Sequence, residues 1–174
     1  INEVLVRVDN GIDRQIIPSQ KADFVLFGGL TRDVYLRVRP QNYISSLQID
    51  TPDVTSQSAT AMATVLVQQH AKSNGPMYLE IEISERGTAV VTAEKTLVSG
   101  TGSGSVQVKL PEIENPSLWS PDTPNLYQVN VVLKDARGRV VHRASEQFGF
   151  RWFGFNDEGG FELNGERLLL RGTH

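Results

Sequence analysis

Alternation of apolar and polar residues dominates the chain from about residue 43 to residue 150. The clearest example is residues 78–84, where three aliphatic residues alternate with two glutamates. They are Leu79, Ile81 and Ile83 against Glu80 and Glu82. A period of two is typical of a strand with one buried face, because successive side chains point to opposite sides of a sheet. No stretch holds a helical period, so the pattern predicts an all-β protein of half-buried antiparallel strands.

The same period predicts a series of further strands along the chain. They cover residues 4–8, 34–38, 43–50, 60–69, 89–98, 106–110, 127–133 and 139–150. Turn signals separate them: Asn74-Gly75-Pro76, Arg86-Gly87, Ala136-Arg137-Gly138 and Asn164-Gly165. Roughly seven short strands at regular spacing between residues 43 and 153 favour an immunoglobulin-like β-sandwich over a closed barrel or a βα unit.

Two polar stretches mark expected boundaries. Residues 39–42 contain a proline that cannot donate to a β-ladder, so they predict a linker before the sandwich. Residues 156–160 are polar and Gly-rich and separate the sandwich from a terminal hairpin. We expect this hairpin to pair residues 161–163 with 167–170 around Asn164-Gly165, because Asn-Gly supplies the positive φ values of a primed turn.

Composition narrows the classes of partner. The 174 residues carry a net charge of -3 without clustered Lys and Arg, which disfavours nucleic acid as a partner. No run of about 20 apolar residues predicts a membrane span, so we expect a soluble protein, cytoplasmic or periplasmic, with the compartment left open. The first residue is not Met and a strand pattern begins at once, so we expect a piece of a longer protein.

Candidate chemistry is sparse. Cysteine is absent, which excludes disulfides and a thiol nucleophile. His70, His142 and His174 lie far apart in sequence, so we expect no zinc site and no cofactor in this chain. The Gly-rich segment 100–104 lacks the following helix and lysine of a phosphate loop, and favours a hairpin tip. Glu80 and Glu82 are interpreted as solvated side chains and not as an acid/base pair. No catalytic group is predicted.

Four stretches, in order, resemble glycoside hydrolase family 2, the group of β-galactosidases, β-glucuronidases and β-mannosidases. They are NEVLVRVDN at 2–10, ADFVLFGGLTRDV at 22–34, LWSPDTPNLY at 118–127, and FGFR at 148–151 with LNGERLLLRG at 163–172. The second is similar to the family's G-G-[IL]-x-R-D-V block, and the third to its L-W-S-P-x-x-P-x-L-Y block.

The resemblance implies a domain organisation and a function. Residues 1–40 would be the last, truncated strands of a sugar-binding jelly-roll domain, 41–155 an immunoglobulin-like sandwich, and 156–174 the lead-in to a (β/α)8 catalytic barrel that the chain does not contain. The sandwich would be a non-catalytic spacer in a retaining enzyme that cleaves terminal β-galactosides, with two barrel glutamates as the catalytic pair. The alternatives are a β-glucuronidase or β-mannosidase parent, or an independent carbohydrate-binding or adhesion sandwich.

The resemblance also suggests roles for individual residues. Asp23 would accept hydrogen bonds from sugar hydroxyls in the intact parent, where the matching aspartate reaches the mouth of the barrel. For Trp119 and Pro121 we favour a structural role, pinning a loop to the sandwich, over stacking on sugar. Arg32 and Asp33 are expected to form charge-assisted hydrogen bonds that fix a turn. Expected partners are therefore the other domains of the same chain, and carbohydrate.

Overall fold

The computed structural model describes residues 3–9, 11, 15, 27–72, 75–97 and 102–172, leaving aside the side chains of residues 96 and 97. It divides the chain into two units, Ile1–Val38 and Arg39–His174. The described residues form strands, turns and extended segments, and no helix among them is long and apolar enough to cross a membrane.

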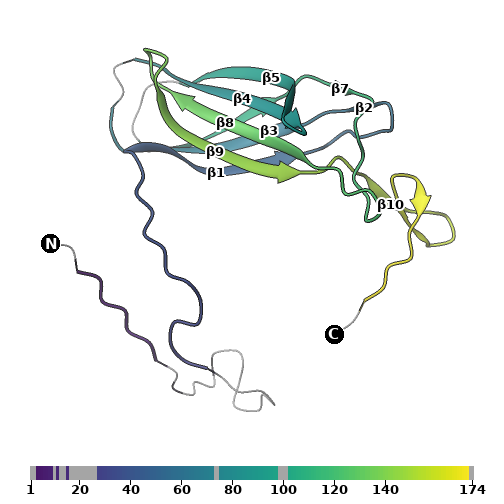
Figure 1. The fold of residues 1–174 in the computed structure, drawn as a ribbon, viewed down its shortest axis with the longest axis horizontal. Helices are drawn as coiled ribbons and strands as arrows, with labels where there is room; N and C mark the ends of the chain where they lie inside the picture. Colours follow the sequence, from purple (N-terminus) through teal and green to yellow (C-terminus); the bar gives the residue numbers. More distant parts are fainter. Residues whose placement is uncertain are drawn as a thin grey trace. The chain divides into compact units, whose positions relative to one another are not determined.

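The second unit is a β-sandwich of two antiparallel sheets (Figure 1). One sheet has the order β5-β4-β8-β9, with β4 Met77–Glu85, β5 Thr88–Leu97, β8 Tyr127–Lys134 and β9 Val140–Phe148. The other has the order β1-β3-β6, with β1 Asn42–Asp50, β3 Met62–Gln69 and β6 Gly102–Lys109. A short pair, β2 Ser58–Ala59 and β7 Ile113–Glu114, lies at one end. The all-β class and the sandwich predicted from alternation are confirmed.

The core lies between the two sheets and is made of the inward-facing residues of the alternating strands. Its members from the central strands are Leu79, Ile81 and Ile83 of β4, Val129, Val131 and Leu133 of β8, and Ala63, Val65 and Val67 of β3. Each such aliphatic side chain larger than alanine contributes ~1.5–3 kcal/mol when it is fully removed from water. The period of two in the sequence therefore translates directly into the packing between the sheets.

Turn chemistry sets two of the connections. Arg86 and Gly87 have φ values of 48° and 83° between β4 and β5, as expected for a two-residue primed turn. Asn164 and Gly165, at 55° and 82°, join β11 Phe161–Leu163 to β12 Glu166–Arg167. This confirms the terminal hairpin, although β12 ends at Arg167, earlier than expected. β10 Phe153–Phe155 adds a third strand to it, which the sequence did not predict.

The hairpin tip expected in the Gly-rich segment was wrong. Gly102 and Gly104 do not form a hairpin tip, because they belong to β6 and pair with Gln69 and Val67 of β3. The connection from β5 to β6 crosses between sheets, and its residues 98–101 lie outside the described ones.

The first unit has no strand in its described residues, although residues 4–8 and 34–38 were predicted as strands. Val4 is 83% exposed and Leu36 is 92% exposed. The prediction of strands at residues 4–8 and 34–38 was therefore wrong. Alternation marks a segment that can form a strand, but a strand also needs a neighbour to pair with, and no β-ladder joins the described residues of this unit.

Candidate functional site

The segment before β8 forms a loop that is tied down at several points. The backbone N–H of Ser117 donates to the phenol oxygen of Tyr127 at 2.9 Å, and Tyr127 itself is only 1% exposed. The amide of Asn125 donates to the carbonyl of Leu118 at 3.0 Å. Because the phenol is part of the core, these bonds fix the loop to the sandwich. They also position Trp119, which directly follows Leu118.

Trp119 is held by the segment that follows β9. The backbone N–H of Trp119 donates to the carbonyl of Phe150 at 2.8 Å. Gly149 lies against its side chain so closely that a Cβ at position 149 would be 2.7 Å from the Trp119 Cβ. On the ring of Trp119 the guanidinium carbon of Arg151 lies 4.5 Å from the centroid, a cation–π arrangement. These contacts agree with the loop-pinning role predicted for Trp119, whereas Pro121 is exposed and its expected role stays a prediction.

Asn164 joins three segments of the chain at this point. Its side-chain N–H donates to the carbonyl of Trp119 at 2.9 Å, and its side-chain oxygen accepts from the N–H of Trp152 at 3.1 Å. Its own N–H donates to the carbonyl of Trp152 at 2.9 Å. The β11–β12 turn, the Trp119 loop and the chain leaving β9 are thereby fixed relative to one another.

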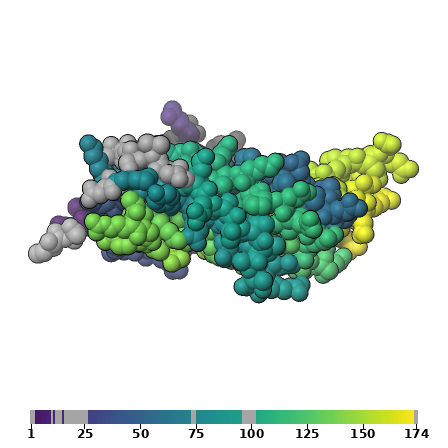
Figure 2. Space-filling model, turned by 90° about the horizontal axis from the view of Figure 1, so that it is seen from above, coloured from purple at the N-terminus to yellow at the C-terminus, as the bar shows by residue number. Residues whose placement is uncertain are grey.

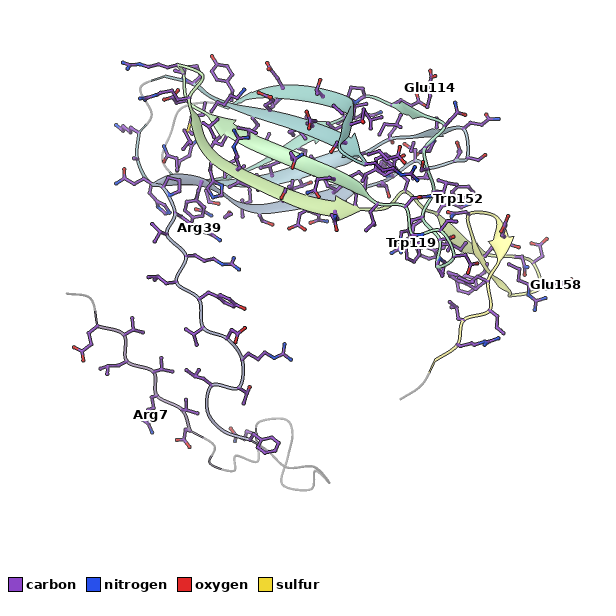
Figure 3. All side chains as sticks on the ribbon, in the orientation of Figure 1. Arg7, Arg39, Glu114, Trp119, Trp152 and Glu158 are labelled. Atoms are coloured by element: carbon purple, nitrogen blue, oxygen red, sulfur yellow. The ribbon has the colours of Figure 1, made fainter. Side chains whose placement is uncertain are left out.

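Two hollows open on this end of the sandwich. The larger hollow, about 660 Å³, is lined by Ile49, Thr51, Trp119, Leu126, Gln147, Phe148, Gly149, Arg151, Trp152 and Phe153. The apolar hollow, about 310 Å³, is lined by Trp119, Pro121, Arg151, Phe153, Phe161, Leu163, Leu168 and Leu170. Trp119, Arg151 and Phe153 line both hollows and form the wall between them, here called the Trp119 wall. Figure 3 shows Trp119 and Trp152 together at this end, beside β10.

Large apolar side chains are exposed around the hollows. Phe153 is 69% exposed, Phe155 71%, Leu169 73% and Leu170 64%. Figure 2 shows the β10–β12 residues, in yellow-green and yellow, gathered at one end of the sandwich. Contiguous exposed apolar residues next to a hollow are typical of an interaction surface. We call these four residues, with the two hollows, the docking surface.

The other residues singled out by sequence lie elsewhere. Asp23 and His174 fall outside the described residues. Asp33 accepts a hydrogen bond from the Tyr35 hydroxyl at 3.2 Å. Among the described residues Arg32 and Asp33 form no ion pair with each other, and their expected role in fixing a turn stays a prediction.

Glu80 and Glu82 of β4 lie on the outer face of the four-stranded sheet, where both line a polar hollow of about 400 Å³. Glu80 forms an ion pair with Lys134 on the neighbouring strand. Both glutamate side chains are partly exposed to solvent, in agreement with their interpretation as solvated residues of the outer face.

Two of the histidines meet at Tyr43, which their sequence separation did not indicate. The rings of His70 and His142 each lie 6.0 Å from the Tyr43 ring, and Arg39 lies over that ring at 4.8 Å. The Nδ1 atom of His142 accepts the N–H of Ile44 at 3.3 Å and so joins β9 to β1 across the seam of the two sheets. Burial, and then the charge of Arg39, lower the pKa of His142 below its usual value.

Acidic and histidine side chains do not assemble into a metal site in the part of the chain that the structure describes, where no three of them cluster. In the β8–β9 turn, the backbone N–H of Arg139 is the main cause that holds the pKa of Asp135 below its usual value. This carboxylate accepts bonds from the N–H groups of Arg137 and Arg139, both at 2.9 Å, and acts as a turn residue.

Comparisons with known proteins agree with the all-β sandwich described above. A family model described as "Glycosyl hydrolases family 2" matches residues 42–151. A candidate beta-glucuronidase of Formosa agariphila is 40% identical over 173 residues, covering 99% of this chain and 20% of the relative. A beta-galactosidase of Thermoanaerobacter pseudethanolicus is 30% identical over 177 residues, covering 99% of this chain and 23% of the relative.

A solved structure gives the same result in three dimensions. Bacteroides uniformis beta-glucuronidase 2, covalently bound to cyclophellitol-6-carboxylate aziridine, superimposes with a TM-score of 0.86 at 31% identity. The match covers 95% of this chain and 21% of that one.

Fold and sheet order define the chain's second unit as an all-β sandwich domain. The chain belongs to glycosyl hydrolases family 2, since the family model covers most of it. It spans about a fifth to a quarter of the length of the relatives that it matches.

Proposed function

We propose that this chain is a non-catalytic spacer of a retaining β-glycosidase, and that its docking surface seats the catalytic domain of the same protein. The observation that carries this proposal is the set of exposed apolar residues around two hollows on a rigid frame. A surface of this kind is stabilised when a partner covers it. In this organisation residues 1–40 belong to a jelly-roll domain, 41–155 to the sandwich and 156–174 to the lead-in of a (β/α)8 barrel.

The reaction is assigned to that barrel, where two glutamates perform retaining hydrolysis. The 174-residue chain should therefore hydrolyse neither a chromogenic β-glucuronide nor a chromogenic β-galactoside. Hydrolysis by the chain alone would overturn the proposal. Measurable affinity of the chain alone for glycans, without such hydrolysis, would favour an independent carbohydrate-binding sandwich instead.

Seating of the catalytic domain is tested in the full-length protein by substituting Leu170, which is 64% exposed and lines the apolar hollow. Leu170→Ser should raise the rate of proteolysis between domains and lower kcat/KM, because part of the buried apolar contact is lost. Val140→Ser, a change at a 46% exposed residue on β9, is the matched control and should alter neither quantity. Equal behaviour of the two variants would contradict docking through this surface.

Two substrate classes are supported. Terminal β-glucuronides are favoured because the 40% identical relative and the Bacteroides uniformis structure carry β-glucuronidase names. Terminal β-galactosides are the second candidate, supported by the 30% identical β-galactosidase. Measuring kcat/KM of the full-length protein on aryl β-glucuronides, β-galactosides and β-mannosides discriminates between these classes.

Asp23 is proposed as a sugar-binding residue in the intact protein, on the strength of the sequence block that it precedes. Asp23→Ala should lower kcat/KM in the full-length enzyme, since a carboxylate that accepts bonds from sugar hydroxyls would be lost. Asp9→Ala, at another aspartate of the first unit, serves as the control. An unchanged kcat/KM in Asp23→Ala would remove Asp23 from the site.

A further inference from the structure

Arg151 is the single charged residue among the described residues that line the two hollows of the docking surface. The larger hollow is otherwise lined by apolar, aromatic, glycine, threonine and glutamine residues, and the apolar hollow by apolar and aromatic residues. A domain that covers both hollows must therefore cover this guanidinium as well. Removing a charge from water is costly unless an opposite charge and hydrogen bonds replace the lost hydration.

The side chain of Arg151 is placed to receive such a partner. It is exposed, and it forms no ion pair with any described residue. The guanidinium carbon lies over the Trp119 ring at 4.5 Å from the centroid, so the ring covers one side of the group and the N–H donors stay available to a partner. A carboxylate matches that edge with two parallel hydrogen bonds, whereas a carbonyl or hydroxyl would leave the charge unbalanced.

We infer that the domain seated on this surface presents a carboxylate side chain to Arg151, flanked by apolar side chains that enter the hollows. This inference rests on the proposed function, since it specifies the chemistry of the partner face. In this arrangement the Arg151 guanidinium contacts the Trp119 ring and also pairs with a carboxylate of the catalytic domain.

The test uses the full-length protein and compares Arg151→Gln, Arg151→Lys and the control Arg137→Gln, which alters an exposed arginine in the β8–β9 turn. Interdomain proteolysis under conditions where cleavage is slow reports the fraction of molecules with separated domains. Arg151→Gln should raise that rate by ~10-fold or more, because it leaves a buried carboxylate unpaired. Arg151→Lys should give a smaller increase, and Arg137→Gln none.

A second arm identifies the acid. Arg151→Glu should separate the domains further than Arg151→Gln, and a single Asp or Glu to Lys change on the catalytic domain should restore the slow rate. Arg151→Gln with a wild-type rate would overturn the inference. If Leu170→Ser then still separates the domains, the proposed function stands and only the carboxylate is lost; if neither variant does, both fail.

One further outcome assigns the carboxylate to the substrate instead of the domain. In that case Arg151→Gln would raise KM for an aryl β-glucuronide and leave both the proteolysis rate and KM for an aryl β-galactoside unchanged. That result would also overturn the inference.

Discussion

The side-chain amide of Asn164 donates to the carbonyl of Trp119 at 2.9 Å, which joins residues that are 45 positions apart. Asn164 also occupies the left-handed region, with φ of 55°, as the first residue of the β11–β12 turn. One residue therefore sets both the turn and the attachment of that turn to the Trp119 loop. Asparagine suits both tasks, because it tolerates positive φ and carries a donor and an acceptor on one short side chain.

Asn164→Gly separates these two tasks, because glycine keeps the positive φ and lacks the amide. Loss of two side-chain hydrogen bonds should lower the free energy of unfolding by ~1–3 kcal/mol, and Asn164→Ala should cost ~1 kcal/mol more because alanine resists the left-handed region. Urea unfolding of the 174-residue chain measures both. Asn115→Gly, at an exposed residue with φ of 48°, should stay within about 0.5 kcal/mol of wild type.

Tyr127→Phe removes the acceptor for the N–H of Ser117 and leaves the aromatic packing in place. The ring still meets Phe150 at 4.9 Å, so the loss is confined to one hydrogen bond and an unpaired N–H. The expected decrease in the free energy of unfolding is ~1–3 kcal/mol. Tyr78→Phe, on the outer face of the same sheet, should be close to neutral. Similar values for the two variants would contradict the anchoring of the loop.

Gly149→Ala tests the close approach of the chain to Trp119. The added methyl group would lie 2.7 Å from the Trp119 Cβ, so the Trp119 loop must shift, at a cost of ~1–3 kcal/mol from overpacking. Gly154→Ala is the control, because no atom lies within 4 Å of the Cβ position there. Thermal unfolding should show a lower Tm for Gly149→Ala and an unchanged or raised Tm for Gly154→Ala.

His142 should make the seam between β1 and β9 sensitive to acid. Burial and then Arg39 lower its folded pKa, whereas in the unfolded chain the pKa of a histidine is ~6.5. Between these two values the unfolded state binds more protons, so the free energy of unfolding falls as the pH drops below about 6.5 and this contribution is constant at higher pH. Urea unfolding from pH 7.5 to pH 5 measures the slope.

His142→Gln removes the titrating group and should flatten that slope. An NMR titration of the imidazole protons reports the folded pKa directly, and Arg39→Gln should raise it. A folded pKa at or above the value of an unstructured histidine would show that the seam does not disfavour the charged ring.

Much of the sandwich could be predicted from sequence because its signals are local. Strands β3, β4 and β8 follow from alternation, and the turns at Arg86 and Asn164 follow from residue types that accept positive φ. Gly102 and Gly104 misled the prediction, because glycine-rich sequence favours a loop whereas the ladder with β3 holds it extended. Pairing with a strand distant in sequence outweighed the local preference.

The candidate site was predictable only in part, for the same reason. Trp119 could be identified as a loop anchor from its block of tryptophan and prolines. Its bond to Asn164, the cation–π contact with Arg151 and the two hollows depend on segments about 30 to 70 residues away, and no local pattern indicates them. The meeting of His70 and His142 at Tyr43 is a further example.

Phe150 is fully buried and Arg151, its neighbour, is exposed. The Phe150 ring packs on Tyr127 and Phe148, and its carbonyl accepts the Trp119 N–H. Contacts from the interior of the sandwich therefore continue directly into the docking surface. If the docking surface seats a catalytic domain as proposed, a destabilising substitution deep in the sandwich would lower the turnover of the full-length protein, far from any atom that touches substrate.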